Sequence, residues 1–85
     1  METGDYVMTG TRNRKTKKIT DGIIGKVLGR QTTIKSDGTK AEMLYVLTPA
    51  GYEYEVNISS KKIHTEVISE RKYFHELMRY PGGIF

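Results

Sequence analysis

The sequence predicts a mainly β domain in which five antiparallel strands form a strongly bent, closed or nearly closed sheet, followed by a short C-terminal α-helix. Three features indicate this fold. Residues 52–58 alternate between apolar and polar side chains, as a strand with one buried face does. Asp37-Gly38 separates two β-forming segments and is typical of a hairpin turn, of type I′ or bulged. Gly22 and Gly25 stand at the start of an aliphatic run, where they allow a strand to bend around a small core.

Turn-forming and basic segments divide the chain into the expected strands. Asp21-Gly22 predicts a tight turn that returns the chain from a basic segment. The third strand has apolar residues on both faces, which suits a central position. The last strand offers Ile63 and Val67 to the core, after a polar connector long enough for one helical turn. The strands are expected at 4–11, 23–35, 41–48, 52–58 and 63–68.

The final segment predicts a helix. Ser69 can cap its start, and the helix is expected to run through Tyr80 before Pro81 and two glycines stop it. Its apolar stripe is wide, so it must pack either on the open end of the predicted barrel or on a partner.

Length and composition indicate one domain, residues 1–85. We expect a barrel at 4–68, a helix at 69–80 and a tail at 81–85. The absence of cysteine excludes disulfides and thiolate metal sites. An acidic start without a long apolar run favours a cytoplasmic protein that does not enter membranes.

Positive charge is concentrated near one end of the chain. Residues 12–35 carry eight Lys or Arg and one Asp, whereas residues 43–85 carry five charges of each sign. Residues 12–18, the basic loop, contain five of these cations and no apolar residue, so they cannot be buried. Such a field favours a polyanionic partner, although a purely solubilising loop would have the same composition.

The order of elements and glycines resembles a known fold family. Gly4-Asp5-x-Val7, then Gly22-x-x-Gly25-x-Val27-Leu28, then an Asp-Gly hairpin, is similar to the SH3-like small barrels and, within them, to the KOW element of some ribosomal proteins and transcription elongation factors. The interval between Val7 and Gly22 is longer than a compact KOW element allows. The resemblance implies a five-stranded SH3-like antiparallel barrel with a short C-terminal α-helix, which acts as a binding module for RNA, DNA or protein.

Signatures of catalysis are missing, so we expect neither an enzyme nor a bound cofactor or metal. His64 and His75 lack the spacing of metal ligands. Glu53 and Glu55 share a strand face, but the outer surface of a small barrel seldom offers the cleft that a catalytic pair needs. Four tyrosines could form a cage for a methylated lysine or pack in the core, and core packing is the simpler interpretation.

Binding to DNA or RNA is the function that the charges favour. Lysine and arginine side chains would neutralise phosphates and carry little sequence information. No exposed aromatic pair for base stacking is apparent near the basic loop. The predicted contacts are Arg12, Arg14, Lys15, Lys17, Lys18, Lys26, Arg30 and Lys35.

The alternative is a protein-interaction module or small inhibitor, of the kind that phages direct against host proteins. It would bind a host or regulatory protein through the basic loop or through the apolar face of the C-terminal helix, because aromatic residues and Met are favoured at binding hot spots. The predicted helix anchors are Tyr73, Phe74, Leu77, Met78 and Tyr80.

Overall fold

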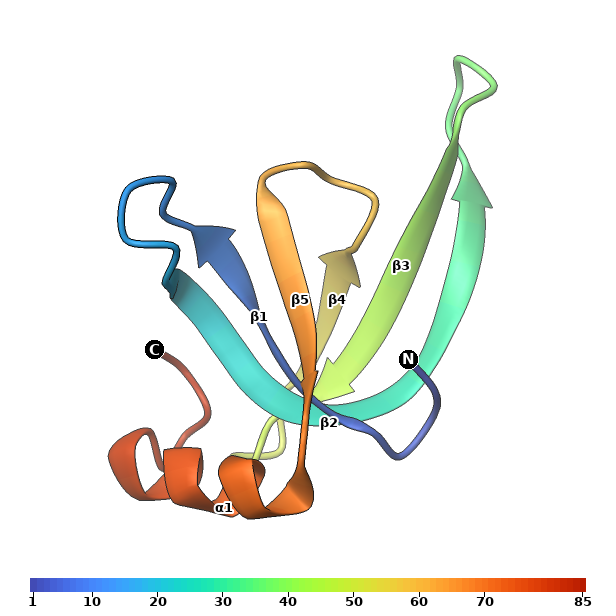
Figure 1. The fold of residues 1–85 in the computed structure, drawn as a ribbon. Helices are drawn as coiled ribbons and strands as arrows, with labels where there is room; N and C mark the ends of the chain where they lie inside the picture. Colours follow the sequence, from blue (N-terminus) through green and yellow to red (C-terminus); the bar gives the residue numbers. More distant parts are fainter.

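The computed structural model describes residues 1–85 and is mainly β. Five strands form one antiparallel sheet in the order β4-β3-β2-β1-β5, and one helix follows them (Figure 1). The predicted fold class, five antiparallel strands with a short C-terminal helix, is confirmed. The elements are β1 (Tyr6–Arg12), β2 (Ile19–Ile34), β3 (Lys40–Leu47), β4 (Glu53–Asn57), β5 (Ile63–Ile68) and α1 (Glu70–Arg79).

The sheet bends strongly but does not close into a barrel, so the expectation of closure is wrong. β4 pairs only with β3, and β5 pairs only with β1, so the ladder of backbone hydrogen bonds ends at these two strands. The segment that joins them forms turns rather than the helical turn that the sequence suggested. The gap between the β4 and β5 edges leaves one side of the sheet open.

β2 is 16 residues long and belongs to both halves of the sheet, and its pairing is irregular at two places. Its first part pairs with β1 and its second part with β3, with irregularities opposite Gly10 and between Val27 and Gly29. Asp21, with φ of 51°, lies inside β2 at the first irregularity. The prediction of a tight turn at Asp21-Gly22 is therefore wrong. These residues form a bulge inside β2 that bends the strand.

Two small hydrophobic clusters stabilise the sheet, one on each face. Val7, Val27, Leu44 and Val46 form the first cluster; Ile24, Ile68 and Tyr73 form the second. Successive residues of a strand point to opposite faces. Val7 of β1 therefore belongs to the first cluster, whereas Tyr6 and Met8 pack against the second. Val67, predicted as a core residue, lies opposite Val7 but is 50% exposed, because β5 is at the open edge of the sheet.

The β2–β3 hairpin projects from the rest of the molecule (Figure 1). Gly38 has φ of 85° whereas Asp37 does not adopt a positive φ, which selects the bulged turn over type I′. The Asp37 carboxylate accepts hydrogen bonds from the Thr39 hydroxyl at 2.6 Å and the Thr39 amide at 3.0 Å. Both hydrogen bonds lower the pKa of Asp37 below its usual value, and the bond from the Thr39 hydroxyl has the larger effect.

The helix packs on its own sheet. Ser69 accepts a hydrogen bond from the Lys72 amide at 3.1 Å, as the sequence predicted for the cap, and Tyr80 ends the helix. The Tyr73 ring stacks on Tyr6 of β1 with 4.1 Å between ring centroids. The helix is ten residues long, and the chain has no helix with the length and apolarity needed to cross a membrane.

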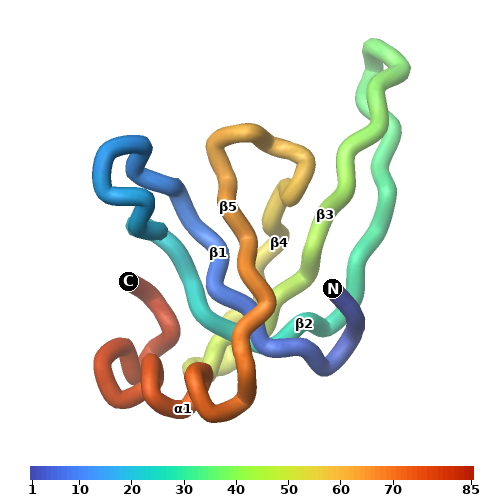
Figure 2. Tube along the Cα trace, viewed as in Figure 1, coloured from blue at the N-terminus to red at the C-terminus, as the bar shows by residue number.

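The last residues of the chain return to β2. The Gly22 amide donates to the Phe85 carbonyl at 2.9 Å, and the Phe85 amide donates to the Gly22 carbonyl at 3.0 Å. This short pairing covers the edge of β2 opposite to β1, because β3 pairs only with the second part of β2. Figure 2 shows the C-terminus beside the beginning of β2.

Candidate nucleic-acid interface

The basic loop is an ordered connection between β1 and β2. The Asn13 side-chain oxygen accepts hydrogen bonds from the amides of Lys15 at 2.8 Å and Thr16 at 3.2 Å. The Asn13 backbone bonds to Lys18 and Lys17, and Lys17 adopts a φ of 58°. These bonds fix the backbone of the loop while its cationic side chains remain exposed, as the sequence predicted.

A basic cleft forms where the end of β1 meets the connector between β4 and β5. It has a volume of about 510 Å³ and its lining contains no acidic residue. Four of the five lining residues are cations, and all five are exposed. We use the name basic cleft for this hollow and its lining residues Thr11, Arg12, Arg14, Lys61 and Lys62.

Strand pairing explains why these distant residues meet. Thr11 of β1 lies opposite Ile63 of β5 in the antiparallel ladder. The residues that follow Thr11 and those that precede Ile63 therefore leave the sheet at the same end. Figure 1 shows the β1–β2 loop and the β4–β5 connector beside each other at that end. Four positive charges in one hollow raise the local concentration of anions.

The eight cations predicted from the sequence lie in different parts of the molecule. Only Arg12 and Arg14 line the basic cleft. Lys15, Lys17 and Lys18 lie in the adjoining basic loop.

The other three predicted cations lie along β2 and beyond it. Lys26 pairs with Tyr6 and Leu47 in the middle of β2. Arg30 and Lys35 belong to the projecting β2–β3 hairpin, at the opposite side of the molecule from the basic loop (Figure 1).

Lys61 and Lys62 line the candidate site but are not among the eight cations predicted from the sequence. Their segment has a local charge of only two, in a half of the chain that is neutral as a whole. The signal that would have found them is the pairing of the last strand with the first, which brings the start of the last strand to the end of the basic one.

The predicted anchors on α1 divide into buried and exposed residues. Tyr73 is 8% exposed and belongs to the second cluster, against which Leu77 and Tyr80 also pack. Phe74 is 53% exposed and Met78 is 83% exposed. They are four residues apart, so they lie on the same face of the helix.

Glu55, one of the two acidic residues on the exposed face of β4, lies beside a tyrosine of β3. Glu55 lies directly opposite Tyr45 in the β3–β4 ladder, and the Tyr45 hydroxyl contacts it at 3.4 Å. Burial, and secondarily the charge of Glu55, raises the pKa of Tyr45. No group of three or more His, Cys, Asp or Glu side chains could hold a metal ion.

These features define a small mainly β domain with a cationic cleft at one end of an open sheet. No protein-family model, curated protein or solved structure matches the chain.

Proposed function

We propose that this protein is a non-catalytic nucleic-acid-binding module that contacts the phosphate backbone through the basic cleft and the adjoining basic loop. The observation that carries the proposal is the meeting of Arg12, Arg14, Lys61 and Lys62 in one hollow without an acidic residue. Guanidinium and ammonium groups bind phosphate oxygens and carry little sequence information by themselves. The resemblance to SH3-like, KOW-type modules supports the same class of function.

Binding through the cleft should depend steeply on salt. If four phosphates are neutralised, affinity for duplex DNA falls by about 100-fold between roughly 50 mM and 200 mM salt, because condensed counterions are released on binding. Replacing the four cleft cations by alanine should remove most of this slope and most of the affinity. Fluorescence anisotropy with labelled duplex and single-stranded oligonucleotides measures both quantities.

A matched control distinguishes the cleft from net charge alone. Lys26, Arg30, Lys35 and Lys40 can be replaced together, which removes the same charge from exposed positions outside the cleft. We expect this variant to retain more of the affinity than the cleft variant does. Equal losses in the two variants would contradict a specific site, and no binding by the native chain at roughly 50 mM salt would contradict the function itself.

The interaction with a host or regulatory protein is a second proposal with a narrower basis. Tyr73, Leu77 and Tyr80 pack against the sheet, so they serve the fold of this chain. Phe74 and Met78 remain as an exposed apolar pair on α1. Two such side chains are a smaller surface than the five-residue anchor that the sequence suggested, and the nucleic-acid proposal therefore explains more of the structure.

A further inference from the structure

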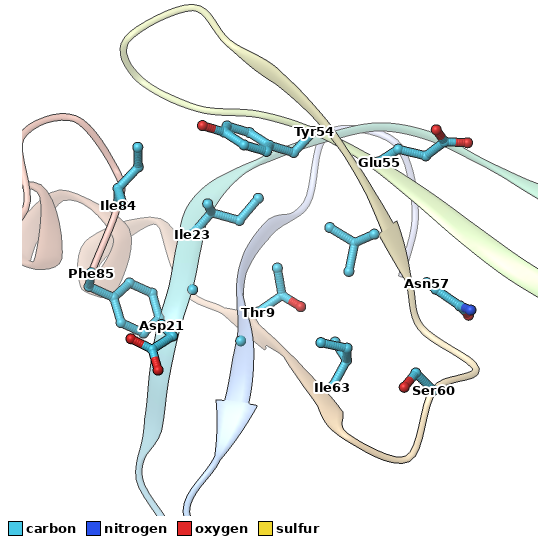
Figure 3. Close-up of a pocket in the computed structure, with 13 residues that line it drawn as sticks. Thr9, Asp21, Ile23, Tyr54, Glu55, Asn57, Ser60, Ile63, Ile84 and Phe85 are labelled. Carbon is cyan, nitrogen blue, oxygen red and sulfur yellow. The ribbon is translucent and has the colours of Figure 1, made fainter.

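A groove lies between the two unpaired edges of the sheet, next to the basic cleft. It has a volume of about 670 Å³ and lies between β4 on one side and the neighbouring strands β2, β1 and β5 on the other. Figure 3 shows Ile23, Thr9 and Ile63 in the space between these strands, with Tyr54 near one end and Ser60 near the other. The volume falls in the range of roughly 300–1,000 Å³ that is usual for ligand sites.

The groove and the basic cleft adjoin each other at two places in the chain. The groove is lined by Gly10 on one wall and by Ser60 on the other, and the next residues in the chain, Thr11 and Lys61, line the cleft. A ligand with negative charge at one end and an aromatic group that carries polar edges at the other would match both linings, since the groove combines apolar side chains with polar ones such as Asp21 and Glu55. A nucleotide has this chemistry.

The lining of the groove fits a nucleobase. Val56, Ile23 and Ile63 provide apolar surface, and the half-buried rings of Tyr54 and Phe85 belong to the lining. Aromatic side chains stack on any base, since every base has a π-face. Asp21 is exposed at the margin of the groove, where its carboxylate can accept hydrogen bonds from the amino group of cytosine.

We propose that the groove accepts unpaired bases of a single-stranded nucleic acid whose phosphates lie in the basic cleft. The proposal rests on the nucleic-acid-binding function and specifies its substrate: a single strand rather than a duplex. A duplex keeps its bases stacked inside, and each base would have to be flipped out at a cost in free energy before it could enter. The Asp21 carboxylate makes cytosine a better occupant than thymine, which lacks an amino group.

The test compares labelled oligo(dC), oligo(dT) and a duplex of equal length by fluorescence anisotropy with the full chain. We expect tighter binding to the single strands than to the duplex. Tyr54→Ala should weaken single-strand binding by about 5- to 150-fold, the effect of losing one stacked base, while duplex binding changes little. Tyr52→Ala is the matched control, because Tyr52 is 64% exposed and does not line the groove.

A second variant tests the contact without a change in packing. Asp21→Asn keeps a residue type that tolerates a positive φ. If Asp21 only repels phosphate, this variant binds oligo(dC) and oligo(dT) more tightly by the same factor. If Asp21 accepts a hydrogen bond from the base, the preference for oligo(dC) falls.

Each outcome decides a different question. Equal affinity for single strands and duplex, with no effect of Tyr54→Ala or Asp21→Asn on discrimination, would overturn the groove proposal. In that case a loss of binding on removal of the four cleft cations would leave the proposed function standing. Absence of binding to all three oligonucleotides would overturn both.

Discussion

Gly22 is the residue at which three segments of the chain meet. It lies beside Gly10 of β1, and its amide and carbonyl bond to Phe85. A Cβ at this position would overlap the carbonyl oxygen of Thr9 and lie 2.8 Å from the Gly10 Cα. Both obstacles are backbone atoms, which cannot rotate away as a side chain can. The absence of a side chain is therefore what lets β1, β2 and the tail approach one another.

We predict that Gly22→Ala lowers the free energy of unfolding by about 2 kcal/mol or more, because the overlap forces the backbone to shift. Urea denaturation followed by circular dichroism measures the loss. Gly29→Ala is the control: a Cβ there meets no atom within 4 Å, and its φ is not in the positive range. We expect the control to change stability by no more than about 1 kcal/mol. Equal losses in the two variants would contradict the role of close approach at Gly22, since a Cβ at Gly29 has no such obstacle.

At the scale of the elements, helix α1 turns a two-sided sheet into a stable domain. β1 has apolar residues on both faces, and the face that carries Tyr6 and Met8 would be open to water without the helix. Tyr73 covers it, stacked on Tyr6 and adjacent to Phe74 at 5.4 Å between ring centroids. Burial, and secondarily the neighbouring Tyr6 phenol, raises the pKa of Tyr73 above its ordinary 10.0.

This pKa shift predicts a loss of stability at alkaline pH. Because the folded state favours the neutral phenol, the contribution is fully present below about pH 10 and is lost as pH rises through the higher pKa of the folded state. Tyr73→Phe cannot ionise, so its stability should decline less between about pH 9 and about pH 11 than that of the native chain. Urea midpoints across this range measure the difference. An equal decline in the two proteins would contradict the role of Tyr73, and Tyr52→Phe, at an exposed position, controls for loss of a phenol.

The elements could be predicted from the sequence more fully than the site could. The Asp37-Gly38 turn, the strand at 63–68 and the cap at Ser69 follow from local patterns, and the structure has all three. Lys61 and Lys62 reach the cleft only because Thr11 pairs with Ile63, a contact between the first and the last strand of the chain. Local patterns do not determine which distant strands become neighbours. The open edge between β4 and β5 was missed for the same reason.

At the scale of the whole molecule, the protein is elongated. Its principal extents are 42 × 31 × 19 Å, and only 14 of 85 residues are buried, so stability depends strongly on backbone pairing. The sheet leaves strand edges unpaired, and such edges are prone to pair with other chains. The pairing of Gly22 with Phe85 is the device that covers one of them.

Removal of Ile84 and Phe85 should therefore both destabilise the protein and promote its association. The deletion removes two backbone hydrogen bonds to Gly22 and the packing of Phe85 on Tyr80, whose ring centroids lie 5.5 Å apart. Together these losses amount to about 3–4 kcal/mol, at about 1 kcal/mol for each hydrogen bond and about 1–2 kcal/mol for a half-buried aromatic ring. Urea denaturation measures the loss of stability, and sedimentation velocity measures the association.

Phe85→Ala is the control, because it retains the backbone hydrogen bonds to Gly22. It should lose only the packing contribution and remain in the association state of the native chain. Association by Phe85→Ala to the same extent as by the deletion would show that the exposed apolar surface, rather than the uncovered edge of β2, drives the contact.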